Sequence, residues 1–400
     1  MTEKIISSYA SLYNLLIECC RDAPDSVKLE ILAGNIADWA EFLDSAYVHG
    51  VFPLVYKSLK SVASIPDDVK LYLKSTNLEI ARRNMTMTAE LLKIMKLLEE
   101  NGISALAIKG PVLSQIIYGD ITQRQFSDLD ILIQEKDLYN SVELLAQYEY
   151  VFEHPIKFLK NKTLLNTEKD IALKKSSSNI YIEMHWRLFV GRLFKKTDIS
   201  LFRVFPHRCL VQGSEVATLD KEVLMLYLLL HGSKHLWERV EWIVDIDRLI
   251  RTDDNLSWEK ILQWAETMEI KPMIYFGIMV SHTLFLTPFP EKVVDMARQN
   301  PNIVKAVDGL IKQIYTNHIH NINPSMNNYY FFGLEGFKYK IYKIFSTFYE
   351  PSTREIYFVN LPTWLSPLYY FILLFNTVYT QVELWWRKIV KSEDVRRKYT

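Results

Sequence analysis

SDLDILIQ, at residues 127–134, alternates polar and apolar side chains with a period of two. This period is typical of a β-strand that buries one face. Residues i and i+2 of a strand point to the same side, so Asp128 and Asp130 would project together while Leu129 faces the other way. Two neighbouring carboxylates repel each other unless a cation lies between them, and Mg²⁺ with substrate phosphates is a common solution. The stretch therefore predicts a strand with a metal-binding acid pair; two solvated acids on an exposed strand are the alternative.

The sequence on both sides of this strand switches repeatedly between short apolar runs and helical patterns. Further strands are expected at ISALAIKG (103–110), IALKK (171–175) and IYIEMHW (180–186), and helices at PVLSQIIYG (111–119) and KDLYNSVELLAQYEY (136–150). Proline in the first turn supports the first of these helices. The alternation predicts a small mixed sheet within a domain of residues 102–218.

The rest of the chain is expected to be helical. LEIARRNMTMTAELLKIMKLLEENG (78–102) is an amphipathic pattern that ends at Asn-Gly, and residues 221–250 predict two helices around a turn near 232–237. The polar stretch 321–328 is expected to be a linker. The predicted fold class is therefore α+β, with a small mixed-sheet domain embedded between helical regions. The predicted regions are an N-terminal helical cap (1–101), the sheet domain (102–218), a helical bundle (219–320) and a C-terminal helical region (329–400).

Lys109, Gly110 and Pro111 lie where a predicted strand gives way to a predicted helix. A helix N-terminus offers free N–H groups and a positive dipole end, and glycine lets a phosphate approach the backbone. Lys109 would add a charge directed at the phosphates. Arg124 is a further candidate for a phosphate contact, because a guanidinium binds phosphate oxygens in pairs; a surface arginine is the alternative.

Glu183, in the strand expected at 180–186, would supply a third carboxylate. His185 should share its strand face, where it would orient an acceptor or act as a base; a structural histidine beside Trp186 is the alternative. A phosphate cradle, a same-face acid pair and a later acid are the parts that metal-assisted nucleotidyl transfer requires.

His231 and His235 are spaced to share a helix face if the predicted turn does not intervene. They would line a substrate cleft or serve in helix packing; zinc binding lacks a third ligand and an HExxH signature. Asp245 and Asp247 repeat the Asp-x-Asp pattern, but residues i and i+2 diverge on a helix, so this pair is not expected to hold one metal.

Composition and motifs exclude several classes of protein. Lysine plus arginine equals aspartate plus glutamate, 47 against 47, so the chain lacks the basic field of a general nucleic-acid binder. Walker, kinase, GxSxG and Rossmann motifs are not found in the sequence, which argues against an ATPase, a kinase, a hydrolase of the GxSxG type and a dehydrogenase. Three cysteines without a CxxC pair indicate neither a disulfide framework nor a zinc site, and with no signal-peptide pattern they favour the cytoplasm.

The apolar stretch LPTWLSPLYYFILLFNTVYTQ (361–381) approaches the length of a membrane-spanning helix. Two prolines and several polar residues interrupt it, so a buried or surface-docked helix is expected. Peripheral membrane contact and a true membrane span are the alternatives.

The order of a glycine, a strand Asp-x-Asp and a later strand acid resembles the DNA polymerase β-like nucleotidyltransferase superfamily. More closely, AIKGPVLSQIIYGDITQRQFSDLDILIQ, IEMHWRLF and LLLHGSKHLWERVEWIVDIDRLI resemble a bacterial nucleotidyltransferase-like family of largely unassigned substrates, over roughly residues 35–250. The resemblance implies Asp128 and Asp130 as metal ligands, Glu183 as the third acid and Gly110 as the phosphate-loop glycine. The superfamily's Gly-Gly or Gly-Ser doublet is replaced here by Gly110-Pro111, which loses one N–H donor.

These observations predict a Mg²⁺-dependent nucleotidyltransferase, with Mn²⁺ as the alternative metal. It would move a nucleoside monophosphate from an NTP to a hydroxyl or phosphate of a small molecule, sugar or modified peptide and release pyrophosphate. One alternative is a catalytically silent nucleotide-binding regulatory or antitoxin-like module. Another is a transferase that uses a different activated donor, such as a nucleotide sugar.

Overall fold

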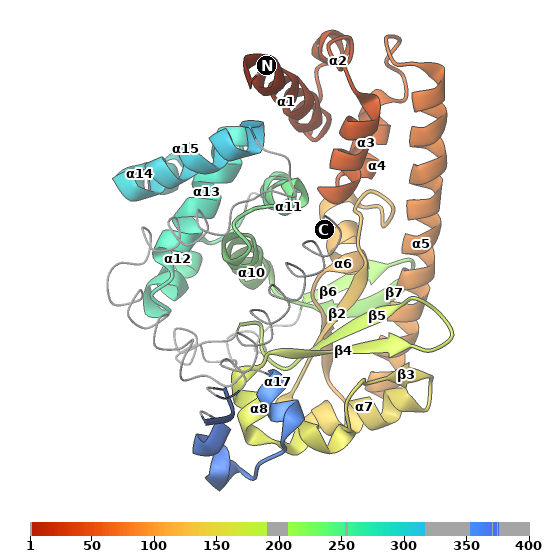
Figure 1. Cartoon of the computed structure of the whole chain (residues 1–400), viewed down its shortest axis with the longest axis vertical. Helices are drawn as coiled ribbons and strands as arrows, with labels where there is room; N and C mark the ends of the chain where they lie inside the picture. The colour runs from red at the N-terminus through yellow and green to blue at the C-terminus, as the bar shows by residue number, and fades with distance from the viewer. Residues whose placement is uncertain are drawn as a thin grey trace, which may run out of the picture.

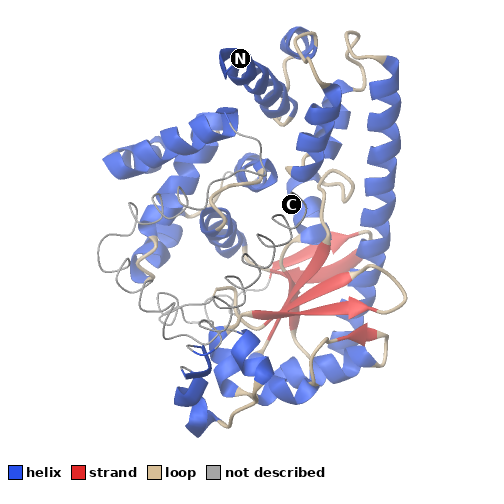
Figure 2. Ribbon diagram, in the orientation of Figure 1, coloured by secondary structure: helices blue, strands red, loops and turns tan. Residues whose placement is uncertain are grey.

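The computed structural model describes residues 2–189, 207–252, 255–316, 353–369, 371–373 and 375. Within these residues a small mixed sheet is flanked by helices on several sides, and the long helix α5 runs past it (Figures 1 and 2). The predicted α+β fold, a small mixed-sheet domain between helical regions, is confirmed.

The central sheet has the strand order β1-β2-β5-β4-β3. Its strands are β1 (Ala105–Ala107), β2 (Asp128–Ile133), β3 (Tyr150–Val151), β4 (Asp170–Lys175) and β5 (Tyr181–His185). β2 and β5 pair in parallel, whereas the other neighbours are antiparallel. The register sets Asp130 directly opposite Glu183, so the two predicted site strands lie side by side.

The sequence did not predict two parts of the β structure. β3 has only two residues, and it follows α7 (Leu138–Ala146) within a stretch that reads as helix throughout. The hairpin of β6 (His207–Val211) and β7 (Ser214–Thr218) turns at Gln212 and Gly213, which have φ values of 47° and 80°. Two left-handed residues are what a tight hairpin turn requires. The Thr218 hydroxyl donates to the carbonyl of Ala107 at 2.6 Å and so fastens this hairpin to β1.

The N-terminal region consists of α1 (Thr2–Cys19), α2 (Ser26–Ala33), α3 (Trp39–Val48), α4 (Phe52–Leu59) and α5 (Asp67–Glu100). The amphipathic pattern predicted from residue 78 is the C-terminal part of α5. Asn84 on this helix is fully buried, and its amide donates to the carbonyls of Ile121 and Arg124 at 2.9 and 2.7 Å. These bonds fix the loop between α6 (Gly110–Tyr118) and β2.

The helical region after the sheet consists of α10 (Lys221–Lys234), α11 (Val240–Thr252), α12 (Trp258–Thr267), α13 (Lys271–Phe285), α14 (Glu291–Arg298) and α15 (Pro301–Thr316). The predicted turn between the first two helices is confirmed. Leu236 and Trp237 adopt left-handed φ values of 56° and 55° there, which direct the buried Trp237 ring against Gly232 and Gly277. Only residues without a side chain leave room for this ring, so it sets the approach of α10 to α13.

Two hydrophobic clusters are found among the described residues. One combines α1, α3 and α4 with α10–α15, so the predicted cap and bundle pack against each other. The other lies between the sheet, the second half of α5 and α7. The sheet domain is thus embedded in a helical body that comes from both sides of it in the sequence.

The C-terminal region is described only in part. α17 (Thr353–Phe358) and the 3₁₀ helix η5 (Thr363–Leu368) lie near α8 (Lys162–Thr167), where the Asn161 amide contacts the Leu361 carbonyl and the Tyr369 hydroxyl, each at 3.3 Å. The remaining short helices are η1 (Glu135–Asp137) and η2 (Ile156–Lys160). The linker predicted at 321–328 falls outside the described residues, as do residues 376–400 and with them the end of the 361–381 stretch. In the described part of the chain, none of the helices has both the length and the apolar character to cross a membrane.

We predict that Gly232→Ala lowers the free energy of unfolding by about 1–3 kcal/mol, the usual cost of overpacking a core. An added Cβ would overlap the Trp237 ring. Gly34→Ala is the control, because its Cβ would meet its nearest neighbour at an ordinary 3.5 Å. Urea denaturation of both variants checks this; equal stabilities would mean that the ring does not need the space at Gly232.

Candidate active site

A cavity of about 520 Å³ lies between the sheet and the α10–α11 turn. Its sheet side carries Asp128, Asp130, Glu183 and His185, its floor carries Lys109 and Gly110, and its helical side carries residues of α10 and α11. Arg124, His231 and His235 line it as well. All of the site residues predicted from the sequence therefore border a single cavity.

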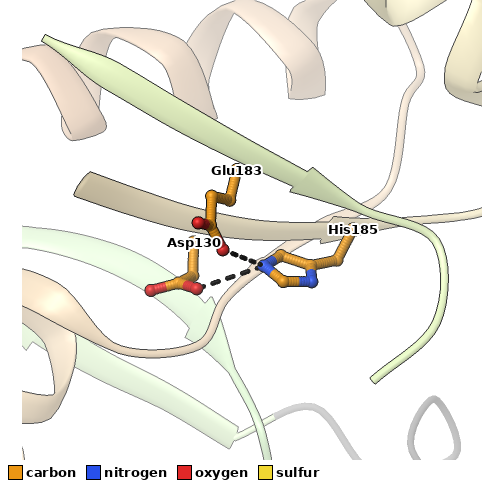
Figure 3. Close-up of side chains that lie close together, drawn as sticks. All are labelled: Asp130, Glu183 and His185. Carbon is orange, nitrogen blue, oxygen red and sulfur yellow. Dashed lines mark hydrogen bonds and ion pairs between the residues drawn. The ribbon is translucent and has the colours of Figure 1, made fainter. Parts of the chain in front are cut away.

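Asp130, Glu183 and His185 converge in this cavity (Figure 3). His185 Nε2 lies 3.1 Å from Asp130 Oδ1 and 3.5 Å from Glu183 Oε2. One donor atom from each of the three residues lies within 4.8 Å of the other two. The pairing of β2 with β5 produces this convergence, because Asp130 faces Glu183 and His185 follows two residues later on the same strand face.

The charges in this group are stabilised unequally. Burial would raise the pKa of Asp130, but the Lys109 ammonium and the hydrogen bond with His185 outweigh it and hold that pKa well below its ordinary value. The hydrogen bond with His185 also lowers the pKa of Glu183. Burial and the neighbouring Asp130 carboxylate instead raise the pKa of Asp128. Asp130 and Glu183 are thus kept ionised, as ligands of a cation must be.

The donor set fits a divalent cation. Two carboxylates that converge on one point, beside a cavity large enough for phosphates, are typical ligands of Mg²⁺. The imidazole nitrogen of His185 would add a ligand suited to a transition metal. Asp128 borders the same cavity but is outside the converging group. The sequence predicted that His185 orients an acceptor or acts as a base; in the structure its ring lies against Asp130 and Glu183, and both roles stay predictions.

Gly110 is the first residue of α6 and has a left-handed φ of 57°. Glycine adopts this conformation without strain, which explains its place at the strand-to-helix junction. Lys109 precedes it, with its Nζ 3.3 Å from Asp130 Oδ1 and its side chain largely buried. The predicted strand-to-helix junction is therefore present, with Lys109 paired to Asp130, and phosphate binding there stays a prediction.

Arg124 forms a buried ion pair with Asp245 of α11. Arg124 Nε and Nη2 each lie 2.9 Å from an Asp245 carboxylate oxygen, and both side chains are less than a tenth exposed. Asp245 and Asp247 bind different partners, as their divergence on a helix predicts: Asp247 accepts from Arg251 and Thr287. The phosphate contact expected of Arg124 stays a prediction, because in this structure Asp245 occupies its guanidinium.

His231 and His235 belong to a row of rings on the helical side of the cavity. Their ring centroids lie 4.9 Å apart, and each lies just over 5 Å from the Trp242 ring. Burial, followed by the Lys234 ammonium, lowers the pKa of His235 to about 4, and burial also lowers that of His231. Two neutral imidazoles beside an indole form a surface suited to hydrogen bonding and stacking. Within the described residues no third ligand joins them in a metal site.

Sequence reasoning missed Asp170, Lys169, Lys234 and Glu241, which also border the cavity. Asp170 is the strand partner of His185, and its Oδ2 lies 3.4 Å from His185 Nδ1. The predicted strand 171–175 begins one residue too late to reveal it. Glu241 is buried at the start of α11, with its Oε1 3.1 Å from Arg239 Nη2, and burial raises its pKa to about 7.

We predict that Asp245→Asn lowers the free energy of unfolding by about 3 kcal/mol or more, because a buried guanidinium loses its partner. Combining it with Arg124→Met should cost less than the sum of the two single changes. A double-mutant cycle measured by denaturant unfolding gives the coupling energy. Additive single effects would contradict an energetic role for this ion pair.

Glu241 should make stability depend on pH in a defined direction. The folded pKa of about 7 lies above the ordinary 4.5, so the folded state binds this proton more tightly. Its contribution is then complete at low pH and is lost as pH rises through the folded pKa. Relative to wild type, Glu241→Gln should therefore gain on the order of 1–3 kcal/mol of stability between pH 5 and pH 8. Glu259→Gln, at an exposed position on α12, is the control; a constant difference across this range would exclude the raised pKa.

Comparison with known proteins identifies the family. The family model for uncharacterised nucleotidyltransferases matches residues 35–286, more than half of the chain. A search of curated proteins found no match. Among solved structures, an antigenic nucleotidyltransferase-like protein from Paracoccidioides brasiliensis is 12% identical with a TM-score of 0.33, covering 56% of this chain and 92% of that chain. The family match spans the sheet, the cavity and α10–α13, and the chain belongs to this family of uncharacterised nucleotidyltransferases.

Proposed function

We propose that this protein transfers a nucleotidyl group from an NTP to an acceptor hydroxyl or phosphate oxygen in a Mg²⁺-dependent reaction, with Mn²⁺ as the alternative metal. The observation that carries the proposal is the register of β2 and β5, which brings Asp130 and Glu183 together beside the N-terminus of α6. Acids that bind a cation and a helix start that binds phosphate are both needed to hold a metal-bound NTP.

Gly110 and Lys109 are proposed to meet the phosphates of the donor. Free N–H groups at the start of α6 would donate to phosphate oxygens, and the left-handed Gly110 lets them approach. Lys109 is paired with Asp130 in the structure. A cation on Asp130 would release the lysine, which would then be able to neutralise a phosphate oxygen.

Asp130 and Glu183, with Asp128, are the residues proposed to hold the metal. When bound there, a divalent cation supplies positive charge to the reacting phosphate and its leaving group. His185 would hold both carboxylates in place through its shared Nε2 contact. Asp170 lies 3.4 Å from the other ring nitrogen of His185 without a hydrogen bond between them, so it would act on the imidazole through its charge.

The proposed reaction is an in-line displacement at the α-phosphate. The acceptor oxygen forms a bond to the α-phosphorus, the bond from that phosphorus to the bridging oxygen of the β-phosphate breaks, and pyrophosphate leaves. When the acceptor is a hydroxyl, its proton passes toward Glu183; an ionised phosphate oxygen has no proton to transfer. His231 and His235 are proposed to contact the acceptor, because their imidazoles line the same cavity.

The acceptor is proposed to be a small molecule, sugar or modified peptide. A cavity of about 520 Å³ is in the size range of small-molecule sites. The equal numbers of acidic and basic residues give no overall field to attract a long polyanion.

One contact favours the alternative of a nucleotide-binding module without turnover. Lys109 already neutralises Asp130, the acid expected to bind the metal. A permanent lysine in that position would leave nucleotide binding intact and prevent metal-assisted transfer. Binding and turnover must therefore be measured separately.

We predict that Mg²⁺ plus an NTP raises the melting temperature more than either alone, because both bind the folded state at one site. With an acceptor present, Glu183→Gln should lower pyrophosphate release by about 10²-fold while NTP affinity changes little. Asp130→Asn should reduce both metal-dependent NTP binding and turnover. Pyrophosphate release from a mixed NTP pool, measured beside binding by calorimetry, provides the test.

Glu291→Gln, at an exposed position on α14, is the matched control and should behave as wild type. NTP binding without pyrophosphate release, across a broad acceptor panel, would favour the silent module. A mass shift of the acceptor with a nucleotide sugar instead of an NTP would favour the other donor. Wild-type turnover in Glu183→Gln would remove this residue from the mechanism.

A further inference from the structure

Lys169 and Lys234 approach the candidate active site from elements that the sequence analysis did not connect with phosphate binding. Lys169 immediately precedes β4, and Lys234 is the last residue of α10. Both border the cavity that holds Glu183 and Asp130. Lys234 is exposed on the cavity wall, and Lys169 is half-buried.

These two ammonium groups lie close enough to act on each other. Burial, with the charges of Lys234 and Lys109 adding to it, lowers the pKa of Lys169 to about 8 despite the nearby Glu183. Burial also lowers the pKa of Lys234, which interacts with Glu168 and Glu183. Positive groups that crowd one wall beside an acid are stabilised when an anion binds between them.

Most other cations that border this cavity are already engaged. Lys109 pairs with Asp130, Arg124 with Asp245 and Arg239 with Glu241. Lys169 contacts the carboxylate of the adjacent Asp170. Within the described ranges, Lys234 has no carboxylate within ion-pair distance, so its charge faces the cavity uncompensated by a direct partner.

The geometry points to Lys234, with Lys169 beside it, as the residue that binds the terminal phosphates of the donor. This inference rests on the proposed function and names the side chains that would distinguish a triphosphate donor from a monophosphate. A metal-bound polyphosphate beside Glu183 would extend past Gly110 toward the helical wall, where Lys234 ends α10. Lys234 would also offset the negative end of the α10 dipole, which otherwise repels an anion there.

The position of Lys234 is fixed by the fold around it. Trp237, three residues later, is wedged against Gly232 and Gly277, and Ser233 donates to the carbonyl of Met273 at 2.8 Å. The end of α10 is therefore held against α13. Because the backbone of Lys234 is already held in place, binding a phosphate there would cost little conformational entropy of the backbone.

The test compares polyphosphate with monophosphate binding to the full chain by calorimetry in Mg²⁺. The probes are an NTP, the corresponding NMP and inorganic tripolyphosphate. Lys234→Met, which keeps most of the apolar stem, should weaken NTP and tripolyphosphate binding by about fivefold or more and leave NMP binding unchanged. Lys234→Arg should recover most of the loss. Lys292→Met, at an exposed position on α14, removes the same charge away from the cavity and should have no effect.

The outcomes separate this inference from the proposed function. If wild type binds NTP, and Lys234→Met binds both NTP and tripolyphosphate as tightly as wild type does, the assignment of Lys234 is wrong and the proposed function stands. An equal loss of NTP and NMP affinity would also overturn it, because Lys234 would then act on the common part of both ligands. If wild type binds no NTP in Mg²⁺, nor when Mn²⁺ replaces it, the proposed function fails and the inference fails with it.

Discussion

The parallel pairing of β2 with β5 is the constraint on which the candidate site depends. Its register is enforced from the opposite face of the sheet, where Leu129, Ile182 and Met184 are fully buried in the core. A shift of one residue would move these apolar side chains into the cavity and the acids into the core, at a prohibitive cost. The hydrophobic face of the sheet therefore determines which polar groups meet on the other. Because Leu129, Ile182 and Met184 must face the core, the alternation of each strand turns Asp130 and Glu183 toward the cavity. The register then sets these two acids opposite each other.

The cavity acquires its other wall from a distant part of the sequence. α10 and α11 contribute aromatic and imidazole rings, Lys234 and Glu241, which face the strand residues across the cavity. The buried pair of Arg124 and Asp245 joins the two sides. Cations and anions share this small volume, and their charges are stabilised unequally: Asp130 is paired with Lys109 and Arg124 with Asp245, whereas burial disfavours the charged forms of Lys169 and Glu241. Charged side chains of both signs therefore already interact with one another in the cavity before any ligand binds. The binding of a metal and a polyphosphate would exchange some of these internal pairs for pairs with the ligand.

The sequence predicted the features that depend on local periodicity. The alternation in SDLDILIQ and IYIEMHW identified the two strands that carry the candidate site, and Gly110-Pro111 marked the start of the helix α6. The partner of Arg124 was not predictable, because Asp245 lies on a helix more than one hundred residues later and its pattern gave no sign of a basic partner. Lys169 and Lys234 were also missed. Each lies at the boundary of an element, where the hydrophobic period does not predict which way a side chain points and only the packing of the folded chain decides it. His185 could be placed on the right strand face, but only the sheet register shows that it joins Asp130.

The ion pair between Arg124 and Asp245 has a consequence for how this architecture can change during evolution. Neither residue can be exchanged alone without leaving a charge in the interior, so the loop before β2 and the middle of α11 are bound to vary together. A sheet domain joined to another helical body would therefore need a matching acid opposite Arg124, or an apolar residue in place of the arginine. New specificities would arise more readily at the cavity rim, where Lys234 and His235 are exposed, than by replacement of one half of the molecule.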